Sequence, residues 1–268
     1  MSGLEVDTAM LEQGRVRVSR DGSLVRVALD RPESRNAQTP STWQALAAIG
    51  RAVHDAADDV AVVVVTGEGP SFSAGLDRRM FTPEGVPGEA SLAQLAGLDA
   101  RQADEWIAAA QSAFTWWREV PPITIAAVRG HAIGAGFQLA LACDLLVAER
   151  DALFAMRETS YGLVPDLAGT SPLVQAVGYP RALEICMTGR MVDADEGYRL
   201  GFVTRVVDDL EVAVGALVDA AGAAPPGAVR ALKPLLRDAP TRTPEAQRAA
   251  ERAAQYDRLR ALLAAWGG

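Results

Sequence analysis

The sequence predicts an α/β fold followed by a helical C-terminal region. The runs VAVVVVTG (60–67) and ITIAAVRG (123–130) are continuously apolar, which is typical of parallel strands that helices bury on both faces. Helical spacing alternates with such runs up to about residue 200, and after about residue 208 only helical spacing follows. We therefore expect a core over residues 1–207 and a helical region over 208–268.

The other elements can be predicted in chain order from their local patterns. Residues 14–30 alternate between apolar and polar, as strands with one buried face do. Ser41 is expected to cap a helix over 43–57. The Gly-, Pro- and Ala-rich residues 81–98 predict a mobile surface segment. Further helices are expected at 99–118, 137–142, 170–177, 181–187, 193–200, 210–222, 227–237 and 243–264, and short strands at 144–149, 152–156 and 202–207.

Composition narrows the class of protein. The chain has 268 residues, of which 49% are apolar and 22% charged, and this is a globular composition. A net charge of −8 argues against a protein that binds nucleic acid or an anionic membrane. Two cysteines and two histidines provide neither a disulfide framework nor a zinc site, so no metal is expected.

The sequence offers no targeting or membrane signal. Its first residues, MSGLEVDTAMLEQG, lack the basic and apolar regions of a signal peptide. The apolar stretch 132–143 is too short to cross a bilayer. We expect a soluble cytoplasmic protein.

A loop of small residues follows each of the two buried strands, SFSAGLD (71–77) and HAIGAGFQLA (131–140). The carboxyl ends of parallel strands meet at one edge of a sheet, where ligands bind. Backbone N–H groups left free there would form an oxyanion hole for a carbonyl oxygen that gains negative charge. The alternatives are close helix–strand packing at Gly134, Ala135 and Gly136, or a dinucleotide loop, although Leu139 stands where the third glycine of that motif belongs.

Five segments together resemble the crotonase superfamily, the enoyl-CoA hydratase/isomerase group. They are RPESRNA (31–37), SFSAGLD (71–77), VRGHAIGAGFQLALACDL (128–145), RETSYGLVPDLAGTSPL (157–173) and ALEICMTGRMVDADEGYRLGFVTRVV (182–207). The resemblance implies a crotonase-like spiral of ββα turns with a C-terminal helical trimerisation region at 208–268. It also implies a coenzyme A thioester as substrate, no bound cofactor, and a homotrimer or dimer of trimers.

The resemblance assigns five residues to the reacting centre. The oxyanion hole would be formed by the N–H groups of Leu76 and Ala135, the latter at a position that usually holds glycine. Glu158 occupies the place of a catalytic glutamate, and Gln138 that of the second glutamate of hydratases. Asp166 stands where some dienoyl-CoA isomerases carry an aspartate, although it is equally suited to cap the helix near Gly169.

The residue types then favour one reaction over another. Water addition needs a base and an acid, and the Gln138 amide cannot exchange a proton. Moving a double bond needs one carboxylate, which Glu158 supplies. We therefore expect an isomerase, with a hydratase in which Gln138 orients the water as the alternative. An alternative of another class is a non-catalytic acyl-CoA-binding protein.

The resemblance also implies contacts to coenzyme A. They would come from Arg35, Ala37, Ala74, Asp77, Arg78, Arg79 and Gly134, and Lys233 would reach the coenzyme A of a neighbouring subunit. Residues 81–98 and AFTWW (113–117) are expected to border the acyl pocket.

Overall fold

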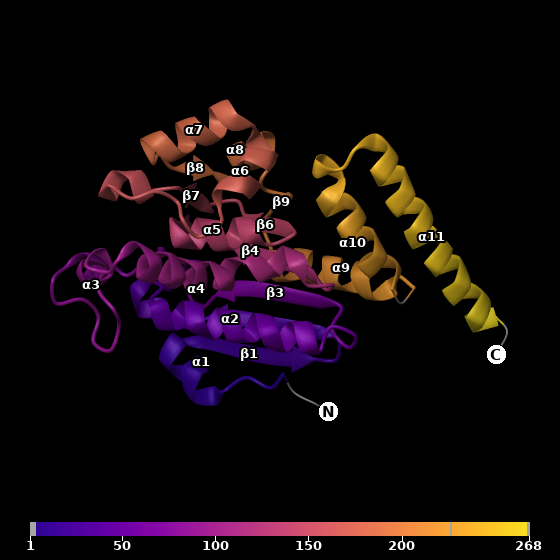
Figure 1. Cartoon of the computed structure of the whole chain (residues 1–268), viewed down its shortest axis with the longest axis horizontal. Helices are drawn as coiled ribbons and strands as arrows, with labels where there is room; N and C mark the ends of the chain where they lie inside the picture. The colour runs from indigo at the N-terminus through magenta and orange to yellow at the C-terminus, as the bar shows by residue number, and fades with distance from the viewer. Residues whose placement is uncertain (1–3, 226, 267–268) are drawn as a thin grey trace.

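A six-stranded sheet forms the centre of the molecule in the computed structural model, which describes residues 4–225 and 227–266. Its strands stand in the order β1-β2-β3-β4-β6-β9 (Figure 1). Only β1 and β2 are antiparallel; the other neighbours are parallel. The strands are β1 (Val16–Asp21), β2 (Leu24–Leu29), β3 (Val62–Gly67), β4 (Ile123–Val128), β6 (Leu145–Glu149) and β9 (Arg205–Val207).

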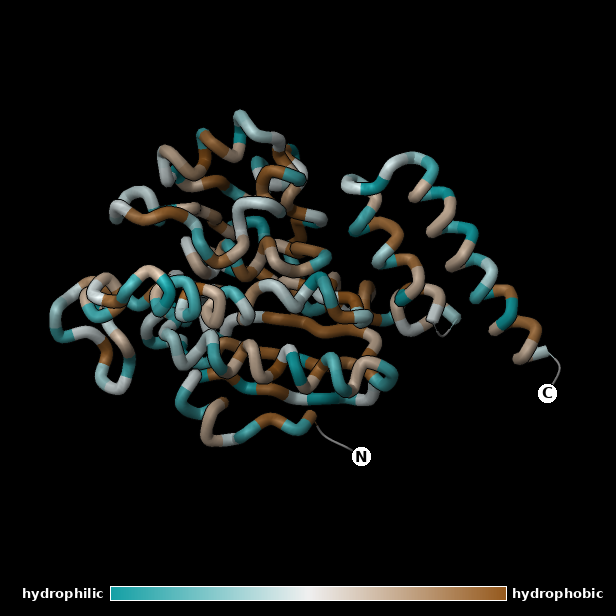
Figure 2. Tube along the Cα trace, in the orientation of Figure 1, coloured by the Kyte–Doolittle hydropathy of each residue, from teal (hydrophilic) through white to brown (hydrophobic). Residues whose placement is uncertain are grey.

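The central strands are buried on both faces, as their apolar runs predict. In β3, Val63 and Val65 face a large core shared with α2 (Pro40–Asp55), α4 (Ala100–Glu119) and α5 (Ala135–Ala142). Val62 and Val64 face a second, smaller core. The helix α9 (Leu210–Ala223) closes that second core through Leu210 and Val214. Figure 2 shows this continuous apolar colouring along the strands.

A second sheet of three short strands lies beside the first, in the order β5-β7-β8. These are β5 (His131–Ile133), β7 (Leu153–Ala155) and β8 (Val192–Asp193). Around it lie α6 (Thr170–Val177), α7 (Tyr179–Thr188) and α8 (Ala194–Leu200) (Figure 1). β5 lies within the stretch expected to be a loop, because three residues pairing with β7 are too few to give a periodic signal.

One local expectation was wrong, and two helices were not predicted. The helix α2 begins at Pro40 with Thr39 as its N-cap, and Ser41 lies buried inside it. The structure adds α1 (Thr8–Gly14), which the sequence pattern did not indicate. Residues 81–98 include α3 (Leu92–Ala96), which a capping box of Ser91 and Gln94 begins.

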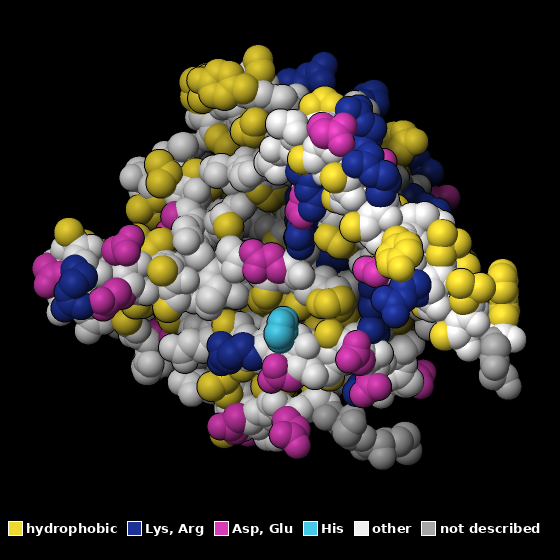
Figure 3. Space-filling view, turned by 45° about the vertical axis from the view of Figure 1, so that its right-hand side comes forward, with side chains coloured by type: hydrophobic (Ala, Val, Ile, Leu, Met, Phe, Trp, Pro, Cys, Tyr) yellow, Lys and Arg dark blue, Asp and Glu magenta, His cyan; other side chains and the backbone are white. Residues whose placement is uncertain are grey.

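The C-terminal helices differ in what they contact. While α9 packs on the sheet, α10 (Ala228–Asp238) and α11 (Pro244–Trp266) form a hairpin that extends from it (Figure 1). Apolar side chains lie exposed on this hairpin (Figure 3): Leu232, Leu236, Tyr256, Leu259, Leu262, Leu263 and Trp266. No single helix in the described ranges is long and apolar enough to span a membrane; α9 with Ala228–Thr241, a pair bent by 110°, meets that test only jointly.

Candidate active site

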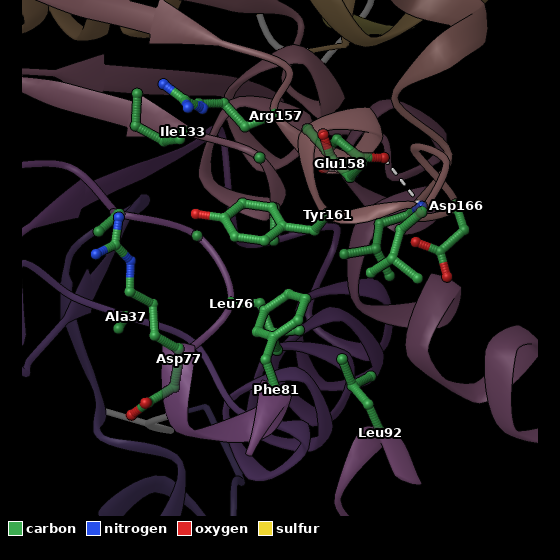
Figure 4. A pocket seen from close by; sticks show the side chains of 18 of the residues that line it. Ala37, Leu76, Asp77, Phe81, Leu92, Ile133, Arg157, Glu158, Tyr161 and Asp166 are labelled. Carbon is green, nitrogen blue, oxygen red and sulfur yellow. Dashed lines mark hydrogen bonds between the residues drawn. The ribbon is translucent and has the colours of Figure 1, made fainter. Parts of the chain in front are cut away.

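A cavity of about 930 Å³ lies at the carboxyl ends of β3 and β4. Its walls come from the loops after these strands, from α3 and α4, and from the short 3-10 helices η2 (Arg78–Phe81) and η3 (Glu158–Tyr161). Figure 4 looks into this cavity, with Glu158 and Asp166 on one side and Ala37 and Asp77 on the other. This cavity thus lies where the two glycine loops were expected to meet.

The two glycine loops contact each other directly. Ser73 forms a β-bridge with Ala132, and a Cβ added to Gly75 would strike the carbonyl oxygen of Ile133 and lie 3.4 Å from the N–H nitrogen of Ala135. Ala135 is the first residue of α5, so its N–H has no partner within the helix. Among the described residues, no group accepts a hydrogen bond from the N–H of Leu76 or Ala135. Two free N–H groups therefore stand together at the cavity wall, suited to a negatively charged oxygen.

Gln138 is fully buried and lies one turn after Ala135 on α5. Its amide oxygen accepts hydrogen bonds from the backbone N–H groups of Leu167 (2.9 Å) and Gly169 (3.2 Å). Its amide nitrogen donates to Glu158 Oε1 at 2.7 Å, along the dashed line in Figure 4. Because the two N–H groups need an acceptor, they fix which end of the amide faces Glu158.

Glu158 keeps one carboxylate oxygen without a partner. No described residue donates to its Oε2, which is buried. Burial raises the pKa of Glu158 above its ordinary value, and the charge of Asp166 adds to the rise. Hydrogen bonds from Gln138 and from the backbone offset this only in part. The raised pKa makes this side chain a carboxyl group suited to take and return a proton.

Asp166 lies in the same cavity and does not cap the following helix. The N-cap of α6 is Gly169, without a side-chain hydrogen bond, so the capping interpretation was wrong. The backbone oxygen of Asp166 accepts from Gln111 on α4 at 2.7 Å. Burial raises the pKa of its carboxyl group. The structure therefore brings Gln138, Glu158 and Asp166 together.

Most of the residues expected to contact coenzyme A line the cavity. Ala37, Ala74, Gly134, Arg35 and the sequence Asp77-Arg78-Arg79 all line the cavity. Asp77, however, is buried and accepts hydrogen bonds from Arg31 (2.7 Å) and Arg79 (2.9 Å). Although burial alone would raise the pKa of Asp77, these arginines outweigh it and hold the pKa well below its usual range. Asp77 thus orients arginines and presents no donor to a phosphate.

Two arginines of the cavity were missed at the sequence level, Arg31 and Arg157. The buried Nε of Arg157 has no hydrogen-bond partner among the described residues. Its side chain lies on the wall near Ile133 (Figure 4). The only sign of Arg157 in the sequence is its position directly before Glu158, because a single arginine in a loop forms no pattern.

The position of Lys233 does not agree with the expected contact to coenzyme A. Its ammonium lies buried under α10, 2.7 Å from the carboxylate of Asp144, and also donates to the carbonyl oxygens of Trp117 (3.2 Å) and Pro122 (2.7 Å). Three acceptors use its three hydrogens. Lys233 is not part of the cavity wall, and its role is to hold α10 on the core rather than to bind coenzyme A.

The apolar part of the cavity also differs from expectation. Residues 81–98 do border it, through Phe81, Leu92, Leu95, Ala96 and Leu98. The run 113–117 does not, because Trp116 and Trp117 are buried and stack on each other. Trp43 and Trp106 line the cavity instead. Phe81 and Tyr161 contact each other across it, with ring centroids 4.9 Å apart.

Metal ligands do not cluster in the described ranges. Over residues 4–225 and 227–266, no group of three or more His, Cys, Asp or Glu side chains is arranged to hold a metal ion.

Comparisons with known proteins place the chain in a family. Residues 19–261 match the family model described as enoyl-CoA hydratase/isomerase. A probable enoyl-CoA hydratase of Mycobacterium tuberculosis, EchA17, is 33% identical over 236 residues, which cover 87% of this chain and 84% of the relative. A probable enoyl-CoA hydratase of Mycobacterium bovis, EchA8, is 32% identical over 73% of this chain and 70% of its own.

Solved structures agree in both fold and sequence. A putative enoyl-CoA hydratase from Thermobifida fusca in complex with CoA is 43% identical, with a TM-score of 0.88 over 96% of this chain and 98% of that one. Its complex with acetoacetyl-CoA gives 44% identity and the same TM-score over 94% of this chain and 98% of that one. With this fold and these matches, the chain belongs to the enoyl-CoA hydratase/isomerase family, the crotonase superfamily.

Proposed function

We propose that this enzyme acts on an unsaturated acyl-CoA thioester through an enolate. The thioester oxygen would accept hydrogen bonds from the N–H groups of Leu76 and Ala135, which have no other acceptor among the described residues. The Thermobifida fusca relative in complex with CoA and with acetoacetyl-CoA supports a thioester of this kind as the ligand. Arg35, Arg78 and Arg157 would bind its phosphates, because no carboxylate in the described ranges pairs with them.

Within that class, we favour double-bond isomerisation by Glu158. The observation that carries this proposal is the single free, buried oxygen of Glu158, Oε2. It would take a proton from C2 of a 3-enoyl thioester, and the electron pair would shift to form a dienolate with its charge on the thioester oxygen. Return of the proton to C4 restores the carbonyl and leaves the 2-enoyl thioester. No water and no second acid are consumed.

Hydration is the second candidate, and Asp166 favours it. Its carboxyl group faces the same cavity with a raised pKa, so a second acid–base group is present. The relatives are named hydratases, which agrees. The route in which the Gln138 oxygen receives a water hydrogen is less suitable, because two backbone N–H groups already use that oxygen. Water would add through Glu158 and Asp166 instead.

The assembly is also a proposal. Residues 208–268 would contribute the contacts of a homotrimer, or of a dimer of trimers, through the exposed apolar side chains of α10 and α11. Because α9 packs on the second core of the sheet, the hairpin after it is the part proposed to make most of these contacts. A core that ended at residue 207 would lack α9, and its second hydrophobic core would be left partly uncovered.

A paired turnover assay tests the reaction. The enzyme is given a 3-enoyl-CoA and a 2-enoyl-CoA separately in deuterated water, and products are identified by chromatography and mass spectrometry. Conversion of the 3-enoyl ester without hydration of the 2-enoyl ester supports isomerisation, and Glu158→Gln should abolish it. Fast hydration contradicts the preference for isomerisation. Tight binding without turnover indicates another reaction of the family or a protein that only binds acyl-CoA.

A further inference from the structure

Gln138 touches both carboxylate-bearing segments of the cavity at once. Its nitrogen end holds Glu158 Oε1, and its oxygen end holds the backbone N–H groups of Leu167 and Gly169. Asp166 immediately precedes Leu167, so the same amide fixes the loop that carries it. One buried side chain therefore connects the two groups available for proton transfer.

Gln138 also relates these groups to the oxyanion hole. It stands three residues after Ala135 on α5, and residues three apart lie on the same face of a helix. The N–H of Ala135 and the Gln138 amide are therefore parts of one rigid helical turn. The place where charge would develop and the place where the proton would be held are fixed by the same element.

The loop around Gln138 leaves it little freedom. A Cβ added to Gly169 would lie 2.6 Å from Gln138 Cγ, so the chain wraps closely around the side chain. Ala168 has φ +62°, a conformation that alanine adopts only when its surroundings impose it. The hydrogen bonds to Leu167 and Gly169 on either side of this residue supply that constraint.

We propose that Gln138 is a positioning residue. It holds Glu158 Oε1 and the Asp166 loop at fixed positions relative to the Ala135 N–H, so that Glu158 Oε2 alone exchanges the proton. This inference rests on the proposed function. It assigns Gln138 neither to water binding nor to proton transfer. Its amide acts on the reaction through the two carboxylates that it fixes.

The groups around Glu158 change its pKa in opposite directions. The hydrogen bond from Gln138 favours the charged form of Glu158, and burial and the charge of Asp166 disfavour it. The Cys186 thiol on α7 also faces Glu158, and its own pKa is raised by burial and by that carboxylate. Loss of the Gln138 donor should therefore raise the pKa of Glu158 further, because the charged form loses a hydrogen bond that favours it.

Two substitutions distinguish the role of the Gln138 amide nitrogen from that of its amide oxygen. Gln138→Leu removes the donor and the acceptor, whereas Gln138→Glu keeps the acceptor for Leu167 and Gly169 and replaces the donor by a like charge. Both variants should move the acid limb of the kcat–pH profile to higher pH. Only Gln138→Leu should also raise KM, because only it releases the Asp166 loop. Gln111→Leu is the matched control, since Gln111 donates to Asp166 O without contacting Glu158.

The decisive readout needs no substrate. The Glu158 carboxyl carbon is titrated by ¹³C NMR, with Glu158→Gln assigning the signal. An upward shift in both Gln138 variants, and none in Gln111→Leu, supports positioning. Unchanged titration of Glu158 in Gln138→Glu, the variant designed to keep the fold, overturns it even if stability falls. Because this measurement is independent of turnover, failure of the proposed reaction and failure of this inference give different results.

Discussion

Gly134 leaves the space that Glu158 occupies: a Cβ added to Gly134 would lie 3.3 Å from Glu158 Oε1. The same glycine has φ +52° and ψ −120°, a region that residues with a Cβ seldom adopt. It also precedes Ala135, whose N–H faces the cavity. A single position thus governs both the carboxylate and the oxyanion hole.

Gly134→Ala should therefore impair activity more than folding. The backbone strain costs about 1–3 kcal/mol, and displacement of reacting groups by about 1 Å can lower kcat roughly a hundredfold. Gly162→Ala is the matched control, because Gly162 also has positive φ but no atom within 4 Å of an added Cβ. Thermal unfolding and kcat are measured on both. Equal loss of kcat in the two variants would contradict this role.

Removal of the Glu158 charge should stabilise the fold at neutral pH. Burial raises the folded pKa of Glu158 above the ordinary value of 4.5, so the ionised form destabilises the folded state. Below pH 4.5 the carboxyl group is protonated in both states and has no such effect. The penalty grows as pH rises above 4.5, where the unfolded chain loses the proton first, and it is complete above the raised pKa of the folded state. The unfolding temperature of Glu158→Gln should exceed that of the unmodified enzyme at pH 8 and approach it at pH 4.

Lys233→Met should destabilise the protein without altering its ligand affinity. The substitution leaves the carboxylate of Asp144, whose side chain is only 17% exposed, without its cation. Breaking such a pair typically costs about 3–5 kcal/mol. Denaturant unfolding measures the loss, and calorimetric titration with CoA measures affinity on the folded fraction. The double variant Lys233→Met, Asp144→Asn should recover part of the stability. Loss of CoA affinity alone, with stability intact, would restore Lys233 to the ligand site.

Arg157→Gln should weaken CoA binding. Its guanidinium is partly buried in the cavity wall, and Nε has no described partner. A hydrogen bond from a charged donor contributes about 1.5–3 kcal/mol, which is roughly ten- to a hundredfold in Kd. Titrations with CoA and with a pantetheine thioester that lacks the phosphates identify the group involved. Equal weakening of both ligands would show that Arg157 does not bind phosphate.

The apolar face of α11 should control assembly. Tyr256, Leu259, Leu263 and Trp266 are exposed and spaced at three, four and three residues, which places them on one side of the helix. Leu259→Glu with Leu263→Glu would place charges in any contact made there. Sedimentation velocity should show a lower mass for this variant, with an unchanged circular dichroism spectrum. An unmodified enzyme that sediments as a monomer would refute the proposed assembly.

What the sequence predicted correctly depends on runs of residues rather than on single positions. The strands at Val62–Gly67 and Ile123–Val128 follow from burial on both faces, which leaves a continuous apolar pattern. The meeting of the two glycine loops follows from parallel strand direction. The short β5 and the N-cap at Thr39 were missed because tertiary contacts outweigh local propensity over so few residues.

The same reasoning explains the errors among site residues. A lysine on an amphipathic helix gives no sign of whether its ammonium reaches a ligand or a half-buried aspartate 89 positions earlier, as Lys233 does with Asp144. The hydrogen bonds of Gln138 to Glu158 and to Leu167 are likewise set by where a later loop folds back. Sequence patterns indicate which face a residue occupies, whereas its partner depends on the tertiary fold.

The cavity wall is assembled from residues as far apart in sequence as Arg31 and Met191. Phe81 and Tyr161 touch across it although 80 residues separate them. A chain that has folded only its first half would therefore lack the part of the wall that carries Glu158 and Asp166. The ligand can therefore bind only to the completed core. Because it binds the folded state alone, a ligand at a hundred times its Kd would add about 2.7 kcal/mol to the free energy of unfolding. Substrate abundance in the cell would thus protect the folded enzyme from proteolysis as well as saturate it.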